Sequence, residues 1–281
     1  MTILTAPDIA RAIEGAEAHH LRVQVETWAA LAGNGAHVVE IAGGVAAFTE
    51  PLFGRKLNHV TGLGMAGHVE AGALATLESA YAACGLGVEI DLCPHAAPAL
   101  LPLLARRGYA VNAFSNTYAR TLDDIDPSGP ATPGIELISG VEASRLFVEA
   151  SVAGFSVQAQ DRPRELLRAL ARIAQARDDT ALFVARVDGR VAGSAGLSVA
   201  STTLGRVAEL YIASTLPDFR GRGVQAALLR ARLSAAKAAG CALAVVMARP
   251  ANASARNTER AGFRLAFTKA TFARPLAHRG N

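Results

Sequence analysis

One stretch of the sequence combines residue types and spacings that suit phosphate binding. It reads Val207-Ala-Glu-Leu-Tyr-Ile-Ala-Ser-Thr-Leu-Pro-Asp-Phe-Arg-Gly-Arg-Gly-Val-Gln-Ala-Ala-Leu-Leu229. A strand leads through a turn into the loop Arg220–Gln225, which opens a helix. The first turn of a helix carries unpaired backbone N–H groups and the positive end of the helix dipole, so it attracts phosphate. The loop's two glycines let the backbone approach an anion, and its two arginines add charge. The alternative is an ordinary strand–helix turn with solvated arginines.

The elements that must position this loop follow from periodicity and turn residues. Asp188-Gly189 predicts a hairpin, Gly240 and Gly262 end helices, and Asp161 is expected to cap a helix. The predicted strands are Gly134–Ser139, Ala181–Val187, Arg190–Val199, Val207–Ala213, Ala242–Ala248, Phe263–Phe267 and Thr271–Leu276. The predicted helices are Val141–Phe155, Pro163–Arg177, Val224–Ala239 and Ser254–Ala261.

The first half of the chain repeats the end of this order at a nearly fixed offset. Four pairs of landmarks lie 154–156 residues apart: Gly85 with Gly240, Pro94 with Pro250, Gly108-Tyr109 with Gly262-Phe263, and Tyr118–Leu122 with Phe272–Leu276. The repeat predicts an internal duplication. We expect an α/β fold of two tandem copies at 1–122 and 134–281, each a mixed, mostly antiparallel sheet flanked by helices. The Pro- and Gly-rich segment 123–133 is the expected linker.

The loop and the order of elements resemble the GNAT superfamily of acyl-CoA-dependent N-acetyltransferases. The pyrophosphate loop of that family reads Gln/Arg-x-x-Gly-x-Gly/Ala and stands between a strand, often with Ala-Glu, and a long helix. This chain matches at Arg220 and Gly223 but has Gln225 where the family usually has Gly or Ala. The Gln225 side chain must therefore point away from the pyrophosphate. The resemblance covers about residues 134–276, and it implies that the first copy is a degenerate acetyltransferase-like domain.

The resemblance implies a set of contacts with acetyl-CoA. Backbone N–H groups of the loop would hold the pyrophosphate, and the strand before the loop would pair with the pantetheine arm. Asn252 and Asn257 stand at a predicted helix start, where they would cap the helix or contact the cofactor. The implied cofactor-binding residues are Leu210, Tyr211, Ile212, Ala213, Arg220, Gly221, Arg222, Gly223, Val224, Gln225, Asn252 and Asn257.

The resemblance also implies the chemistry. Glu209 falls where many relatives keep a carboxylate that deprotonates the substrate amine, which needs a lone pair to attack a thioester. Thr258 stands near the position of a tyrosine that protonates the departing thiolate, although a hydroxyl of threonine is a poor acid. The expected reaction is transfer of an acetyl group to a primary amine by direct attack in a ternary complex. The acceptor, a small molecule or a peptide, is not identified by the sequence, and no metal is expected.

Two other functions compete with this interpretation. The first is a non-catalytic acyl-CoA-binding protein. It stays an alternative because the tyrosine that would protonate the departing thiolate is missing. The second is NAD(P) or FAD binding, because Gly62-Leu-Gly-Met-Ala-Gly67 fits G-x-G-x-x-G and Glu89 and Asp91 follow at the usual spacing. The strand expected before these glycines, Lys56–Val60, is weak, so we prefer the acetyltransferase.

The amino-acid composition excludes several other classes of protein and of binding partner. The 281 residues are 51% hydrophobic and 19% charged, which excludes a mainly disordered chain. Residues 1–130 carry 7 Lys and Arg against 13 Asp and Glu, while the rest carry 21 against 11, so an anionic ligand is expected in the second half. The arginines lack interleaved aromatic residues, so no nucleic-acid partner is expected. No apolar stretch predicts a membrane span. We expect a cytoplasmic location, and the sequence leaves open whether the protein forms a homodimer.

Cysteine and histidine give no metal-site pattern. Cys84, Cys93 and Cys241 are odd in number and lack metal-type spacing, which favours a reducing compartment. The histidines at positions 19, 20, 37, 59, 68 and 95 show no ligand spacing with carboxylates or cysteines.

Overall fold

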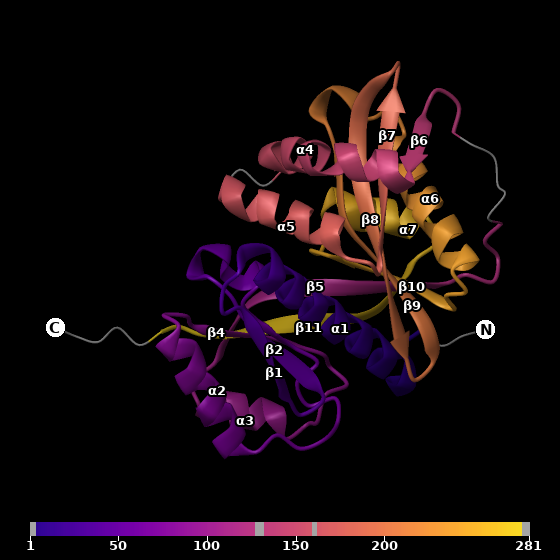
Figure 1. The fold of residues 1–281 in the computed structure, drawn as a ribbon. Helices are drawn as coiled ribbons and strands as arrows, with labels where there is room; N and C mark the ends of the chain where they lie inside the picture. The colour runs from indigo at the N-terminus through magenta and orange to yellow at the C-terminus, as the bar shows by residue number, and fades with distance from the viewer. Residues whose placement is uncertain (1–3, 127–131, 159–161, 277–281) are drawn as a thin grey trace. The chain divides into compact units, whose positions relative to one another are not determined.

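The protein is described by a computed structural model that covers residues 4–126, 132–158 and 162–276 (Figure 1). Its contacts divide it into two compact units. The first consists of residues up to Thr117 together with the segment from Leu265 onward, and the second runs from Tyr118 to Arg264. Each unit is a mixed sheet with helices on both faces, as the sequence predicted.

The first unit holds the sheet order β1-β2-β3-β4-β11-β5, in which β3 and β4 are parallel. Helix α1 packs its apolar residues on one face of β2, while α2 and α3 share a core with the other face (Figure 1). The elements are α1 (Pro7–Ala32), β1 (His37–Ile41), β2 (Gly44–Phe48), the 3₁₀ helix η1 (Pro51–Lys56), β3 (Val60–Thr61), α2 (Ala71–Ala83), β4 (Val88–Leu92), α3 (Leu100–Arg106), β5 (Ala110–Thr121) and β11 (Arg264–Arg274).

The second unit continues from the end of β5 in the order β5-β10-β9-β8-β7-β6. Helices α4 and α5 cover one face of this sheet, and α6 packs against the other (Figure 1). The elements are β6 (Glu136–Ser139), α4 (Gly140–Gln158), α5 (Arg164–Ala176), β7 (Thr180–Val187), β8 (Arg190–Thr202), β9 (Gly205–Thr215), the 3₁₀ helix η2 (Pro217–Phe219), α6 (Val224–Ala238), β10 (Leu243–Ala248) and α7 (Ala253–Arg260).

The compact units differ from the two sequence copies at their last strands. Strand β11 ends the second copy but pairs antiparallel with β4 of the first unit, from Ala270↔Leu92 to Arg274↔Val88. The end of β5 belongs to the second unit, where the Tyr118 hydroxyl donates to the Glu259 carboxylate at 3.0 Å. The division at 123–133 therefore stays a prediction about the duplicated sequence, while β11, from the end of the second copy, belongs to the sheet of the first unit.

Three local expectations differ from the structure. The two closing strands predicted at Phe263–Phe267 and Thr271–Leu276 are one continuous strand, β11, because no turn residue interrupts them. The strand expected at Lys56–Val60 is reduced to β3, since η1 takes up its first residues. Asp161 lies outside the described residues, and α5 is preceded at its N-cap by Pro163.

Turn predictions from glycine are confirmed. Asp188 and Gly189 have φ of 52° and 72°, the left-handed pair that a two-residue hairpin of type I′ requires. Gly85 and Gly240, which the repeat aligned, have nearly equal φ of 71° and 73° after their helices. Equal backbone conformations at aligned positions support the duplication.

A buried ion network fixes β11 in the first unit. Lys269 of β11 lies 2.6 Å from a Glu17 carboxylate oxygen and 3.1 Å from Glu14, both on α1. Burial alone would lower the pKa of Lys269, but the carboxylates of Glu14, Glu17 and Asp91 outweigh it and raise the pKa. Burial raises the pKa of Glu14 to about 7, so this carboxyl takes up a proton when the medium turns mildly acidic.

We expect Lys269→Met to lower the free energy of unfolding by about 3–5 kcal/mol at pH 8, because it leaves buried carboxylates without their cation. The loss should shrink towards pH 5. Glu14 binds a proton more tightly in the folded than in the unfolded chain, so protonation favours the folded variant as the pH falls. Urea unfolding at the two pH values measures both effects. Lys237→Met, on the surface of α6, is the control and should change stability by under about 0.5 kcal/mol; equal losses in the two variants would contradict the network's role.

Helix α6 buries a second charge without a carboxylate bound to it. The Arg232 Nε donates to the Leu228 carbonyl at 3.1 Å and Nη1 donates to the Gly196 carbonyl at 3.4 Å. Burial lowers the pKa of Arg232 to about 9. Hydrogen bonds to two carbonyls offset little of the free energy lost when the charged guanidinium is removed from water. We therefore expect Arg232 to lower the free energy of unfolding.

Arg232→Met should therefore raise the free energy of unfolding, by about 1–3 kcal/mol, since the methionine fills the site without a charge. Denaturant unfolding at pH 7 tests this. Arg230→Met, an exposed position on the same helix, should leave stability within about 0.5 kcal/mol of the wild type. A destabilised Arg232→Met would show that the two carbonyl bonds outweigh the burial of the charge.

Candidate functional site

The site forms where two parallel strands of the second unit part. The pairing of β10 with β9 covers Leu243↔Val207, Ala244↔Ala208 and Val245↔Glu209, although both strands continue beyond it. Past this point Ile212 has φ of 46°, and the register of β8 with β9 shifts between Ser194 and Gly196. The backbone after Glu209 therefore turns away from β10 and faces a gap.

The loop after β9 presents backbone donors to this gap. Gly221 and Gly223 have φ of 75° and 80°, a conformation that favours glycine. Gly223 is the N-cap of α6, and the first helical hydrogen bond runs from Ala227 N–H to the Gly223 carbonyl at 3.0 Å. The N–H groups of Val224, Gln225 and Ala226 therefore have no acceptor within the helix. Together with the helix dipole they make an anion site.

A groove of about 1770 Å³ runs along this end of the second unit. It exceeds the usual 300–1,000 Å³ of a small-ligand pocket, so it has room for a long cofactor. Eight of the residues proposed from the sequence line it: Ala213, Arg220, Gly221, Gly223, Val224, Gln225, Asn252 and Asn257. Six others do not: Glu209, Leu210, Tyr211, Ile212, Arg222 and Thr258.

Several of these side chains have structural partners. Arg222 pairs with Asp188 at 2.8 Å and its guanidinium lies over the ring of Phe219. Asn252 caps α7 by accepting from the Ala255 N–H at 2.7 Å. Arg222 thus points into the hairpin turn, and Asn252 offers the groove only its remaining polar atoms.

The structure shows what the side chains do at the two positions that depart from the expected pattern, Gln225 in the loop and Thr258 near the place of the acid. The Gln225 side-chain oxygen accepts from the Thr215 hydroxyl at 3.5 Å, which leaves the Gln225 backbone N–H at the helix start. Thr258 is 3% exposed within α7. Its hydroxyl is not part of the groove wall, so the structure gives it no access to a leaving group there.

The sequence did not point to the arginines that line the groove away from the loop. Arg120, Arg230 and Arg260 join Arg220 in the wall, against Asp124 and Asp126. Helical spacing could have indicated two of them, because Arg230 lies seven residues after Gly223 and Arg260 three after Asn257. The excess of arginine suits a polyanionic ligand.

Glu209 lies in a polar row across the sheet rather than on the groove surface. Thr180, Ser198 and Glu209 are directly opposed on β7, β8 and β9, so their side chains share one face. Glu209 is 5% exposed. Arg177 and Tyr211 stand on the same face, and the charge of Glu209 raises the pKa of both, although burial of the phenol is the main reason that the pKa of Tyr211 reaches about 12.

The cysteines are poorly placed for covalent chemistry. Burial raises the pKa of Cys93 to about 12 and also raises the pKa of Cys241. A thiol with a raised pKa is a weak nucleophile at neutral pH. Neither residue lines the groove, nor does the exposed Cys84.

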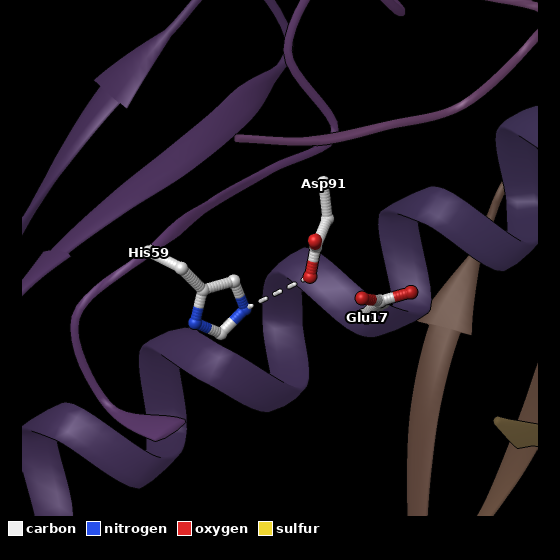
Figure 2. A group of neighbouring side chains, drawn as sticks. All are labelled: Glu17, His59 and Asp91. Carbon is white, nitrogen blue, oxygen red and sulfur yellow. Dashed lines mark ion pairs between the residues drawn. The ribbon is translucent and has the colours of Figure 1, made fainter. Parts of the chain in front are cut away.

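A group with metal-ligand residue types lies in the first unit, and its members are too far apart in sequence to have been noticed. One ligand atom each of Glu17, His59 and Asp91 lies within 4.8 Å of the others (Figure 2). Glu17 already accepts from Lys269, and Asp91 accepts from Arg55 and from Thr271 at 2.7 Å. Two cations thus neutralise these carboxylates, so a divalent ion would have to displace both. We assign this group to the ion network of Lys269.

The glycine motif of the first unit is engaged in packing. The N–H groups of Gly64 and Ala66 donate to the Ala42 carbonyl, and that of Met65 donates to the Gly62 carbonyl. A Cβ on Gly44 would lie 2.2 Å from the Thr61 carbonyl oxygen, so the chain passes too closely for a side chain. Because the loop's N–H groups are used internally, they are not available to a pyrophosphate, which removes the main support for dinucleotide binding.

None of the helices within residues 4–126, 132–158 and 162–276 combines the length and apolar character that crossing a membrane requires.

Comparison with known proteins agrees with the geometry of the second unit. Residues 146–263 match the model of the acetyltransferase (GNAT) family. No curated protein sequence matches the chain. The solved GCN5-related N-acetyltransferase from Kribbella flavida has a similar fold, with a TM-score of 0.64, 19% identity, and coverage of 93% of this chain and 96% of that one.

A second solved structure bears on the tandem arrangement. A tandem GNAT protein from the clavulanic acid biosynthesis pathway matches with a TM-score of 0.56 and 15% identity, covering 74% of this chain and 70% of that one. At such identities the likeness concerns the fold alone. The chain therefore has the fold of tandem GNAT proteins, and its residues 146–263 match the model of the acetyltransferase (GNAT) family.

Proposed function

We propose that the protein transfers an acetyl group from acetyl-CoA to a primary amine, within a ternary complex and without an acyl-enzyme. One observation carries the proposal: the end of β9, past its last pair with β10, and the N-terminus of α6, with backbone donors that the helix does not use, line a single groove. The family match supplies the class of reaction. The buried cysteines with raised pKa support direct transfer.

Different residues of the chain bind different parts of acetyl-CoA. N–H groups of Gly221–Gln225 hold the pyrophosphate, and Arg220, Arg230 and Arg260 offset its charge and that of a further phosphate. The backbone of Tyr211–Ala213, which β10 leaves open, pairs with the pantetheine amides. Leu210 and Ile212 contribute backbone only, since Leu210 faces the core beneath α6. Asn257 contacts the cofactor from α7.

Glu209 is the proposed base. It is buried off the groove, so it removes the proton of the acceptor ammonium through water. The neutral amine nitrogen then attacks the thioester carbonyl carbon, the carbon–sulfur bond breaks, and CoA leaves as the thiolate, which takes up the extra proton of the nitrogen through water to leave the amide and the CoA thiol. A thiol with a pKa near about 8.5 leaves without strong acid help, so the proposal gives Thr258 no proton to move.

We expect acetyl-CoA, and not NAD, to bind the wild type in calorimetry. Gly223→Ala should weaken acetyl-CoA binding at least about tenfold, because the φ of 80° disfavours a Cβ and relaxation would turn the N–H groups of α6 away from the anion. Gly205→Ala is the matched control. Gly205 has φ of 98° in the β8–β9 turn, so its variant carries similar strain but should bind acetyl-CoA normally. Binding of NAD without acetyl-CoA would overturn the proposal.

Glu209→Gln should leave acetyl-CoA affinity nearly unchanged and lower turnover about 10²–10⁴-fold, the usual contribution of a general base. The deficit should shrink at high pH, where more of the acceptor amine is already neutral. An amine-library screen for released CoA thiol supplies a working acceptor, and the pH–rate profile is then measured. Glu136→Gln, an exposed carboxylate on β6, is the control. A wild-type-like profile for Glu209→Gln would remove this residue from the mechanism, and CoA binding without thiol release from any amine would indicate a non-catalytic binding protein.

A further inference from the structure

Ile212 holds a backbone conformation that its own side chain opposes. A β-branched residue with positive φ is an outlier, and such a conformation costs on the order of 1–3 kcal/mol. The residue stands in β9 just past the last pair with β10, beside the register shift with β8. Strain of this kind persists only where the surrounding structure holds it.

The neighbouring Tyr211 is fixed along the whole length of its side chain. Its ring crosses β8 at Gly196, where an added Cβ would lie 3.1 Å from the Tyr211 Cε1 and 3.0 Å from the Ile212 Cγ2. Its hydroxyl lies 2.9 Å from the Thr180 Oγ1 on β7. The side chain therefore spans three strands, and a side chain at position 196 would crowd this path.

Arg177 lies over the same ring. Its guanidinium carbon lies 5.6 Å from the ring centroid of Tyr211. The Asp179 carboxylate accepts from Nε at 2.8 Å and from Nη2 at 2.7 Å, which holds the planar guanidinium in one orientation. The Arg177 side chain is fully buried, and a desolvated cation–π contact is stronger than an exposed one. Contacts with Gly196, Thr180 and Arg177 thus hold the ring in place, and we call this arrangement the clamp.

We propose that Arg177 is a positioning residue for acyl-CoA: it holds Tyr211 across Gly196, and this clamp holds Ile212 in its left-handed conformation so that the next residue, Ala213, presents its backbone to the groove. The inference rests on the proposed function, because it needs acetyl-CoA as the ligand of that backbone. Arg177 is not part of the groove wall. It acts through Tyr211, so its effect should depend on the ring being present.

Acetyl-CoA calorimetry on single and double variants tests the clamp. Arg177→Met and Tyr211→Leu should each weaken binding about tenfold, and the double variant should be no weaker than either, because both remove the same interaction. Arg177→Lys should recover part of the loss, since an ammonium keeps the charge but not the two-point bond to Asp179. Tyr211→Phe keeps the ring and should lose no more than about threefold. In turnover assays KM for acetyl-CoA should rise more than kcat falls.

Arg168→Met is the control, because that arginine forms an exposed pair with Glu149 and should bind acetyl-CoA as the wild type does. Thermal unfolding identifies any variant that is not folded. If Arg177→Met is unfolded, the acetyl-CoA affinities of Arg177→Lys and Tyr211→Phe test the clamp instead. Wild-type affinity in Arg177→Lys would then overturn it. Additive losses in the double variant would do the same. A wild type that does not bind acetyl-CoA overturns the proposed function, and the clamp with it, whereas a binding wild type with an equally tight Arg177→Met overturns the clamp alone.

Discussion

The early end of hydrogen bonding between β9 and β10 is the constraint on which the second unit depends. Parallel strands normally pair along their shared length, and unpaired backbone groups away from water cost free energy. Here the pairing of β9 with β10 stops at Glu209 while both strands continue, so beyond this point β9 is no longer bound to β10. The loop at Arg220–Gln225 places the start of α6 at the same gap. The proposed acyl-CoA fits both features, because it carries amides along an extended arm and phosphates beyond that arm.

The corresponding place in the first unit is filled by the chain itself. Strands β3 and β4 pair over only Val60↔Ile90 and Thr61↔Asp91. The loop that follows folds back, and the Gly64 carbonyl accepts from the Ala97 N–H at 3.1 Å. A Cβ on Gly64 would lie 3.2 Å from Leu100, so apolar side chains close the space. The same divergence of strands therefore gives a groove in one copy and a packed core in the other, which agrees with a degenerate first copy.

Local patterns predicted most of the elements because they depend on near neighbours. The Asp188-Gly189 turn, the start of α6 at Gly223 and the paired helix ends at Gly85 and Gly240 follow from backbone sterics that a few residues decide. Among the groove arginines, the loop pattern identified Arg220, while the others were indicated by the charge excess and, for Arg230 and Arg260, by helical spacing. Long-range contacts were not predictable: Tyr211 reaches Thr180 across Gly196, and Glu17 meets Lys269 from the far end of the chain. Such pairs leave no periodic pattern in the sequence, so the clamp and the ion network could be identified only in the three-dimensional structure.

The place of β11 in the first unit shows why such long-range polar contacts matter to this fold. β5 and β11 end in nearly the same sequence, Tyr118-Ala-Arg-Thr and Phe272-Ala-Arg-Pro, so their apolar patterns alone would fit either position. They differ three residues before that motif, where β11 has Lys269 and β5 has Ser115. A serine opposite Glu14 and Glu17 would leave two buried carboxylates without a cation, at a cost of several kcal/mol. The lysine therefore contributes more to the choice of strand than to net stability, and a buried ion pair that stabilises weakly can still decide which of two similar strands completes a sheet.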